Sequence, residues 1–298
     1  MESCNYLFKL PYLAKLKIIG NAAADFLQGQ VSCDMRQVSA NMMRQGALCN
    51  LQGRVLALID FILWHDYHCI LPNNLLPVIQ ESLLKVALLM RIKMTVDLNT
   101  VFCGFYLGDA NDLLPLSLTL PPQKLGFAAN DESCCYNLGN NFYIILIHRQ
   151  AFTAFTKPFI ERKQMRSVHD WHKLQLQQKH IAIYPETSGL FLPHRLNLHL
   201  AGYLSFDKGC YRGQEIIART HYRAKLKYEL QIFIIDTTEK IIAGKKIFDF
   251  ITQREIGKLI DFCRLEFTKY LIVASMLLEH QAQVLVAGHQ NPVMLISY

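Results

Sequence analysis

The residues with the clearest potential for chemistry are a cysteine and its neighbours in the segment K-G-C-Y-R-G-Q-E. Cys210 lies between Gly209 and Gly213, and Lys208 and Arg212 are the nearest cations on either side. Glycines are typical of places where the backbone turns tightly or approaches a ligand. The residues that follow predict a helix, so Cys210 would lie just before or at a helix N-terminus, where the positive end of the dipole and two cations favour a thiolate. Such a cysteine can act as a nucleophile, a metal ligand or a redox sensor; an ordinary buried thiol is the alternative.

Three arginines accompany this segment. If the predicted helix is continuous, Arg212, Arg219 and Arg223 lie at i, i+7 and i+11 and within about 40° of one another around the axis. The stripe is either a solvated helix face or a site for anion contacts, with phosphates or glutamate carboxylates as partners.

Histidines and acids elsewhere offer weaker candidates. His169 and His172 have the spacing of two metal ligands on one helix face, but no third ligand is identifiable nearby, so we expect no metal site. Asp60 lies beside a strand end, close in sequence to a histidine at 65 and an aspartate at 66. These residue types could imitate an acid–base set, but the sequence does not fix their relative positions. Trp171 offers a ring on which a flat ligand could stack, or a side chain of the hydrophobic core.

Composition limits the class of protein. The chain has 298 residues, a formal net charge of +7 and nine cysteines at irregular spacing. An odd number of cysteines without a C-x-x-C pair argues against a disulfide framework and against a local zinc or cluster site. We find no signal peptide and no apolar run long enough to span a membrane, so we expect a cytoplasmic protein with reduced thiols and no membrane partner. The basic charge is compatible with an anionic partner such as RNA.

The pattern of predicted elements gives an α+β fold in two parts. We predict a strand at 13–19, a hairpin at 46–63 around Gly53, a helix from residue 73 or 74 to 90, and a helix at 168–179. From residue 227 the sequence reads as several short strands, which suggests a small barrel or sandwich. We therefore expect residues 1–223 to form one region of two intertwined α+β subdomains and residues 224–298 to form a C-terminal β-barrel.

The segment at 208–215 resembles the signature of the YgfZ folate-binding proteins, K-G-C-(aromatic)-x-G-Q-E. Its residues are Lys208, Gly209, Cys210, Tyr211, Arg212, Gly213, Gln214 and Glu215. The resemblance extends to F-L-Q-G-Q-V-S-C-D at 26–34, G-A-L-C-N-L-Q-G-R-V at 46–55 and T-S-G-L-F-L-P-H-R-L-N-L at 187–198. A helix that begins near Trp171 is also similar to the family's tryptophan-led helix. Landmarks cover residues 13 to 223.

The resemblance implies the fold of the glycine-cleavage aminomethyltransferase: a three-domain cloverleaf around a tetrahydrofolate pocket, with a C-terminal barrel. It also implies a tetrahydrofolate-binding accessory protein that supports assembly or maintenance of iron–sulfur proteins, including tRNA-modifying enzymes. Cys210 would be the functional thiol, and Trp171 would bind the pterin. No well-defined catalysed reaction comes with the family.

This sequence departs from the aminomethyltransferases at both of their carboxylates. The segment 55–59 lacks the aspartate that follows the hairpin glycine, and Gln177 stands at the folate-contacting glutamate. Leu13 and Lys179 also replace residues that relatives carry as an aromatic and a glycine. Without a base near the folate nitrogen, aminomethyl transfer is disfavoured. A folate-dependent one-carbon transferase and an RNA-associated basic protein remain as alternatives.

Overall fold

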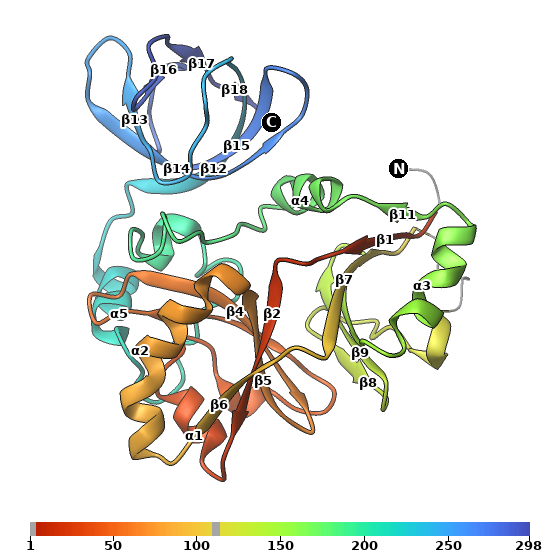
Figure 1. Cartoon of the computed structure of the whole chain (residues 1–298). Coiled ribbons are helices and arrows are strands. Elements are labelled where there is room, and N and C mark those ends of the chain that lie inside the picture. Colours follow the sequence, from red (N-terminus) through yellow and green to blue (C-terminus); the bar gives the residue numbers. More distant parts are fainter. Residues whose placement is uncertain (1–3, 109–113) are drawn as a thin grey trace.

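A computed structural model describes residues 4–108 and 114–298 of the chain. Three β-sheets with their helices are grouped around a common centre, as Figure 1 shows. We call them sheet I, sheet II and the barrel. The expected α+β cloverleaf with a barrel near the C-terminus is present.

Sheet I has five strands in the order β3-β4-β5-β2-β6, all of whose pairings are antiparallel. The hairpin between β3 (Arg44–Cys49) and β4 (Val55–Trp64) turns at Gly53, whose φ of 71° favours glycine. Three α-helices and two short 3₁₀ helices accompany this sheet. The elements are β2 (Leu13–Ile19), α1 (Ala23–Gln28), η1 (Met35–Gln37), β3 (Arg44–Cys49), β4 (Val55–Trp64), β5 (Asp66–Pro72), η2 (Asn73–Leu75), α2 (Leu76–Leu89), β6 (Lys93–Asp97) and α5 (Gln214–Arg223).

Sheet II has six strands in the order β11-β1-β7-β10-β9-β8. Its central strands are almost fully buried on both faces, because α3 covers one face and residues of sheet I pack against the other. The elements are β1 (Tyr6–Lys9), β7 (Thr100–Tyr106), η3 (Pro115–Ser117), β8 (Phe127–Ala129), β9 (Ser133–Gly139), β10 (Phe142–His148), α3 (Phe152–Glu161) and β11 (Met165–Arg166).

Helix α4 (Val168–Gln177) follows sheet II and runs beneath the barrel (Figure 1). It begins with a capping box, in which the Ser167 hydroxyl accepts from the Asp170 backbone N–H and the Asp170 carboxylate accepts from the Ser167 backbone N–H. The chain then crosses to η4 (Pro193–Leu196) and reaches α5 on sheet I. Residues far apart in the sequence therefore meet at the centre of the molecule.

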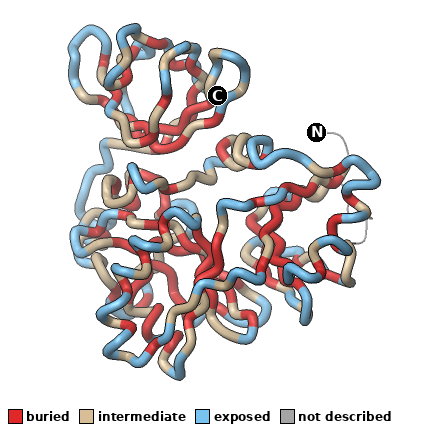
Figure 2. Tube along the Cα trace, viewed as in Figure 1, coloured by how far each residue is buried: buried red, intermediate tan, exposed pale blue. Residues whose placement is uncertain are grey.

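The barrel is a seven-stranded sheet in the order β17-β16-β13-β14-β15-β12-β18. Its two edge strands are separated in the sequence by Leu295 alone, so the sheet is nearly closed. The strands are β12 (Tyr228–Asp236), β13 (Lys246–Asp249), β14 (Glu255–Arg264), β15 (Lys269–Leu277), β16 (Gln283–Val286), β17 (Val293–Met294) and β18 (Ile296–Ser297). The segment from α5 to the barrel is exposed (Figure 2).

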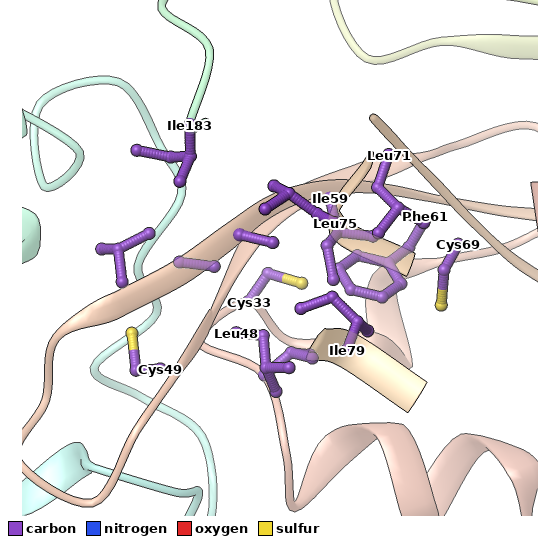
Figure 3. Packing of buried hydrophobic residues seen from close by; sticks show 14 of the residues in the cluster. Cys33, Leu48, Cys49, Ile59, Phe61, Cys69, Leu71, Leu75, Ile79 and Ile183 are labelled. Atoms are coloured by element: carbon purple, nitrogen blue, oxygen red, sulfur yellow. The ribbon is translucent and has the colours of Figure 1, made fainter. Parts of the chain in front are cut away.

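The largest core lies between sheet I and its helices and continues to the outer face of the barrel. Cys33, Cys49 and Cys69 pack there among branched and aromatic side chains such as Phe61 (Figure 3). Each of these thiols is at most 2% exposed. They serve as small apolar side chains of the core.

Candidate functional site

The loop that carries Cys210 is open to solvent. Cys210 is exposed, and a Cβ added to Gly209 would meet no heavy atom within 4 Å. Helix α5 begins only at Gln214, after Gly213 at a φ of 81°. Of the two expected positions for Cys210, just before or at a helix N-terminus, the structure has the first, and a left-handed turn at Gly213 separates the thiol from the first helical residue.

Gly213 is required by a close approach of two loops. A Cβ on this residue would lie 2.5 Å from the carbonyl oxygen of Asn50 and 3.0 Å from the Cα of Gly53. The hairpin of sheet I and the Cys210 loop thus touch through two glycines. Their contact fixes the loop against the body of the protein.

Lys208 points into the protein and not toward the thiol. Its ammonium donates hydrogen bonds to the carbonyl oxygens of Gln28, Val31 and Cys33 at 2.8, 2.7 and 2.7 Å. Burial lowers the pKa of Lys208 to about 8, so at pH 7 most of the population still carries the proton. The predicted contribution of this cation to a Cys210 thiolate is not supported by the geometry, because its three N–H bonds are used to hold the loop after α1.

Arg212 is also engaged elsewhere. Its guanidinium donates to the carbonyl oxygen and the hydroxyl of Ser82 on α2, at 3.1 and 2.5 Å. The residue precedes α5, so it does not extend a stripe with Arg219 and Arg223. The predicted three-arginine stripe is corrected to two helical arginines.

The remaining residues of the motif complete the loop. The Tyr211 side chain is 7% exposed, and the Lys208 ammonium lies 4.9 Å from the centre of its ring. The Gln214 side-chain carbonyl accepts from the Tyr211 backbone N–H at 3.2 Å. Glu215 is exposed in the first turn of α5. These contacts stabilise the loop and leave Cys210 accessible.

An exposed basic segment follows the motif. Arg219 and Arg223 are exposed on α5, and Lys225 and Lys227 are exposed in the link to the barrel. None of the four has an ion pair within residues 4–108 and 114–298. Tyr222, which is 70% exposed, lies among them. Cations interleaved with an exposed aromatic ring suit a polyanion with planar groups.

Two adjoining cavities occupy the centre of the molecule. The inner cavity has a volume of about 130 Å³ and the outer one about 330 Å³. We call the pair the central cavity. Its walls are mostly apolar, with a few polar groups, as is typical of small-molecule sites. Both cavities are lined by Tyr12, Pro72, His172, Ala182 and Ile183.

Trp171 lines the inner cavity, but its ring is only 1% exposed. The ring packs between Phe8 and Phe142, at centroid distances of 5.2 and 5.6 Å, and a Cβ at Gly104 would lie 2.6 Å from it. The prediction that Trp171 presents a free face for stacking is wrong, because core side chains and the backbone of β7 occupy that space. Tyr12, which is 37% exposed, is the aromatic ring that both cavities share.

Asp60 brings a carboxyl group to the inner cavity. It lies two residues after Leu58 on β4, and the alternation of a strand puts both on the same face. Its two oxygens accept from Gln45 at 2.9 Å and from the Tyr136 hydroxyl at 2.8 Å. Burial raises the pKa of Asp60. The sequence could not fix this geometry, because Tyr136 comes from the other sheet.

His172 is the second titratable group that faces the cavity. Its Nε2 lies 3.0 Å from the carboxylate of Asp261, a residue of β14 that is 0% exposed. The hydroxyl of Tyr184, on the wall of the outer cavity, donates to the same oxygen at 2.6 Å. This arrangement joins α4 to the barrel and was not foreseen, because the partners are 89 residues apart.

Two positions at which the sequence departs from related patterns are also visible: Gln177 departs from the aminomethyltransferase pattern and Lys179 from the YgfZ pattern. The Gln177 amide donates to the Tyr298 hydroxyl at 2.5 Å and does not line either cavity. Lys179 has a φ of 60°, so it occupies the left-handed conformation that suits the glycine of relatives.

Across the described ranges, no three or more histidine, cysteine, aspartate or glutamate side chains are arranged to hold a metal ion. Within the same ranges, no helix has the length and apolar character needed to cross a membrane.

Comparisons with known proteins agree with this geometry. No family model matches the chain. It is 28% identical over 229 residues to the tRNA-modifying protein YgfZ of Colwellia psychrerythraea, covering 76% of this chain and 70% of that protein. Proteins of the same name from Vibrio atlanticus and Escherichia coli are 24% and 23% identical over 82% and 81% of this chain, and 73% and 75% of their own lengths are covered. The resemblance to YgfZ proteins predicted from the sequence is confirmed.

A solved structure is similar in fold. Aminomethyltransferase T of the glycine cleavage system from Bartonella henselae superposes with a TM-score of 0.77 at 13% identity, covering 100% of this chain and 86% of that one. The predicted aminomethyltransferase-like fold is confirmed.

Proposed function

We propose, on the premise that this chain is a homologue of the YgfZ proteins, that it is a cytoplasmic tetrahydrofolate-binding accessory protein for iron–sulfur proteins, including enzymes that modify tRNA. The names of the relatives and the folate-enzyme-like fold support a role in tRNA modification. The observation that carries the finer proposal is the accessibility of Cys210. It is the only exposed cysteine of the nine, and it lies in the loop that resembles the family signature.

A functional thiol must be reachable by its partner. Cys210 meets this condition, since Gly209 leaves open space beside it, whereas eight cysteines are buried or half-buried. A thiol is a soft ligand and nucleophile, which a serine hydroxyl near neutral pH is not. The proposal assigns to Cys210 the contact with an iron–sulfur client protein.

Tetrahydrofolate fits the chemistry of the central cavity. A pterin needs a mostly apolar slot with a few polar groups. The walls supply the Tyr12 ring, the Asp60 carboxyl and the His172 imidazole. Bound folate would supply a reduced one-carbon carrier, and these side chains would bind and orient it.

The test combines binding with function in cells. We expect tetrahydrofolate to bind the purified protein in a calorimetric titration. We expect Cys210→Ser to bind it as wild type does and to fail to restore modification of tRNA by iron–sulfur enzymes in cells that lack the wild-type chain. Cys4→Ser, at a half-buried position outside the motif, serves as the matched control. Equal restoration by Cys210→Ser and wild type would refute the role of the thiol, and absence of binding would refute the folate proposal.

A folate-dependent aminomethyl transferase is the less supported alternative. Ala57–Leu58 lacks the first acid that the resemblance implies. Gln177 stands in place of the second and is bonded to Tyr298 outside the cavity. Asp60 lies in the cavity, but each of its oxygens already accepts a hydrogen bond, from Gln45 or from Tyr136. A general base needs an oxygen within reach of the proton that it takes from the ligand. We expect no methylene-tetrahydrofolate from a loaded carrier protein, and robust formation would restore this alternative.

An RNA-associated role is favoured by the exposed basic segment. Arg219, Arg223, Lys225 and Lys227 could neutralise phosphates, and the exposed ring of Tyr222 could stack on a base. We expect tRNA binding that weakens as salt rises. The double variant Arg219→Glu/Arg223→Glu should bind less well, whereas Lys157→Glu on α3 should not. An unchanged affinity in the double variant would exclude this segment.

A further inference from the structure

The barrel contributes a buried carboxylate behind the wall of the central cavity. Asp261 is 0% exposed, and each of its oxygens is occupied. One accepts from the Tyr184 hydroxyl and the Phe262 backbone N–H, and lies 3.0 Å from His172 Nε2. The other accepts from the Ala182 backbone N–H at 2.9 Å. These donors satisfy the buried carboxyl group, and His172 is the titratable side chain that lies beside it.

The position of Asp261 fixes how His172 uses its two nitrogens. Nε2 faces the carboxylate and donates to it, so Nδ1 is the nitrogen left for the cavity. Nδ1 has no hydrogen-bond partner within the described residues, and the ring lines both the inner and the outer cavity. Burial alone lowers the pKa of His172, but the hydrogen bond and the charge of Asp261 outweigh it, so the pKa is raised. In the protonated form of the ring, which the pairing with Asp261 favours, Nδ1 carries a hydrogen that it can donate to a ligand in the cavity.

The other two histidines of the central cavity differ. His180 is bonded through Nδ1 to Gln175, and burial together with Lys124 lowers its pKa to about 4, so it is neutral at pH 7. His169 lies one turn before His172 on α4, and its Nε2 bonds to the carbonyl oxygen of Arg264. Neither ring is paired with a carboxylate. The further titratable groups on these walls are acids, none of which carries a positive charge: Asp60, Tyr12, Tyr184 and Tyr203.

We propose that His172, held by Asp261 of the barrel, donates a hydrogen bond from Nδ1 to an oxygen acceptor of the ligand in the central cavity. This inference rests on the proposed folate function. In a reduced folate the acceptor is the pterin ring carbonyl or a glutamyl carboxylate. His172 touches the ligand, and Asp261 is the positioning residue that sets the tautomer and charge of the imidazole.

The test separates contact with the ligand from the link between α4 and the barrel. In His172→Gln the side-chain amide can still reach Asp261 where Nε2 does, but nothing replaces Nδ1. We expect this variant to unfold at the same urea concentration as wild type and to bind tetrahydrofolate about 10 to 100 times more weakly, as for one lost charge-assisted hydrogen bond. His280→Gln is the matched control, with unchanged affinity, because this histidine lines neither part of the central cavity and its Nε2 bonds to the Gln231 side chain of the barrel.

Two further measurements identify the acceptor atom and separate failure of this inference from failure of the folate proposal. If 6-methyltetrahydropterin, which lacks the aminobenzoyl-glutamate tail, shows the same loss in His172→Gln, the acceptor is on the pterin; if the loss disappears, the acceptor is in that tail. Both results support the inference. Equal tetrahydrofolate affinity of wild type and His172→Gln would overturn it while leaving the folate proposal intact. A wild-type protein that binds no tetrahydrofolate would overturn both.

Discussion

Replacing Lys208 by methionine tests whether this residue of the motif serves the fold or the thiol. Methionine keeps most of the apolar length and removes the ammonium. Three carbonyl oxygens, those of Gln28, Val31 and Cys33, then lose their donor in a place where Lys208 is 7% exposed. Each unsatisfied buried acceptor costs about 1–3 kcal/mol.

The net cost is smaller than the sum of those penalties, since the variant no longer buries a charge. We expect Lys208→Met to lower the free energy of unfolding by about 3–5 kcal/mol, the range for breaking a buried charged interaction. The free energy of unfolding of a whole domain is typically about 5–15 kcal/mol, so this loss would be a large part of it. A change of about 1 kcal/mol is already large enough to measure.

Urea unfolding at pH 7 measures this loss, with Lys225→Met as the exposed control. Backbone amide exchange should accelerate in residues 28–34, where the three carbonyl groups lie. The alkylation rate of Cys210 should not change, because the ammonium of Lys208 faces residues 28–34 and not the thiol. A variant within about 1 kcal/mol of wild type, or one with normal stability and slower alkylation of Cys210, would refute the reasoning.

Three further expectations follow from the described contacts. Iodoacetamide at pH 8 should modify Cys210 first among the nine cysteines, as mass spectrometry of peptides can show; modification of another thiol first would contradict its unique exposure. Gly104→Ala should destabilise the protein by about 1–3 kcal/mol in urea unfolding, because its Cβ would lie 2.6 Å from the Trp171 ring, whereas Gly209→Ala should have little effect. His194 is 2% exposed, and burial together with His199 and His221 lowers its pKa to about 4 from an ordinary 6.5. The unfolded chain therefore binds an extra proton at residue 194 between these pH values. His194 alone should contribute up to about 2 kcal/mol to the fall in unfolding free energy from pH 7 to pH 5, and His194→Gln should remove that part of the fall.

Local patterns predicted the elements well. The alternation at 13–19 and the turn at Gly53 correspond to β2 and to the β3–β4 hairpin, and the amphipathic run at 168–179 corresponds to α4. These features depend on neighbours in the sequence. The glycine at 213 was also identified as a turn, although its contact with Asn50 could not be known.

Side-chain direction was not predictable in the same way. Lys208 and Arg212 are adjacent to Cys210 in sequence, but their partners are carbonyl groups of residues 28–33 and Ser82. Cys210 lies before the helix, as one of the two expected positions, but the left-handed turn at Gly213 that separates the thiol from the helix N-terminus could not be placed from the sequence. Trp171 was placed on the right helix, but its burial depends on β7 of another sheet.

The contacts of the cavity-lining residues could not be predicted from the sequence for the same reason. Asp60 was noted without a geometry, and His172 was considered only as a metal ligand. Their partners Tyr136 and Asp261 lie 76 and 89 residues away in the chain. Contacts at that separation are set by how the sheets pack, for which single-sequence periodicity carries no signal.

The buried thiols are distributed over three cores, so their reactivity can report partial unfolding of each core. Cys33, Cys49, Cys69 and Cys263 belong to the core of sheet I, Cys134 to the core between the two sheets, and Cys103 and Cys135 to the core beneath α3. Burial raises the pKa of Cys33, Cys49, Cys103 and Cys135 to about 12 and that of Cys263 to about 11. Each becomes reactive only when its own core opens. With Cys210 blocked first, the order in which the others are labelled would rank the local stability of these three cores without any introduced probe.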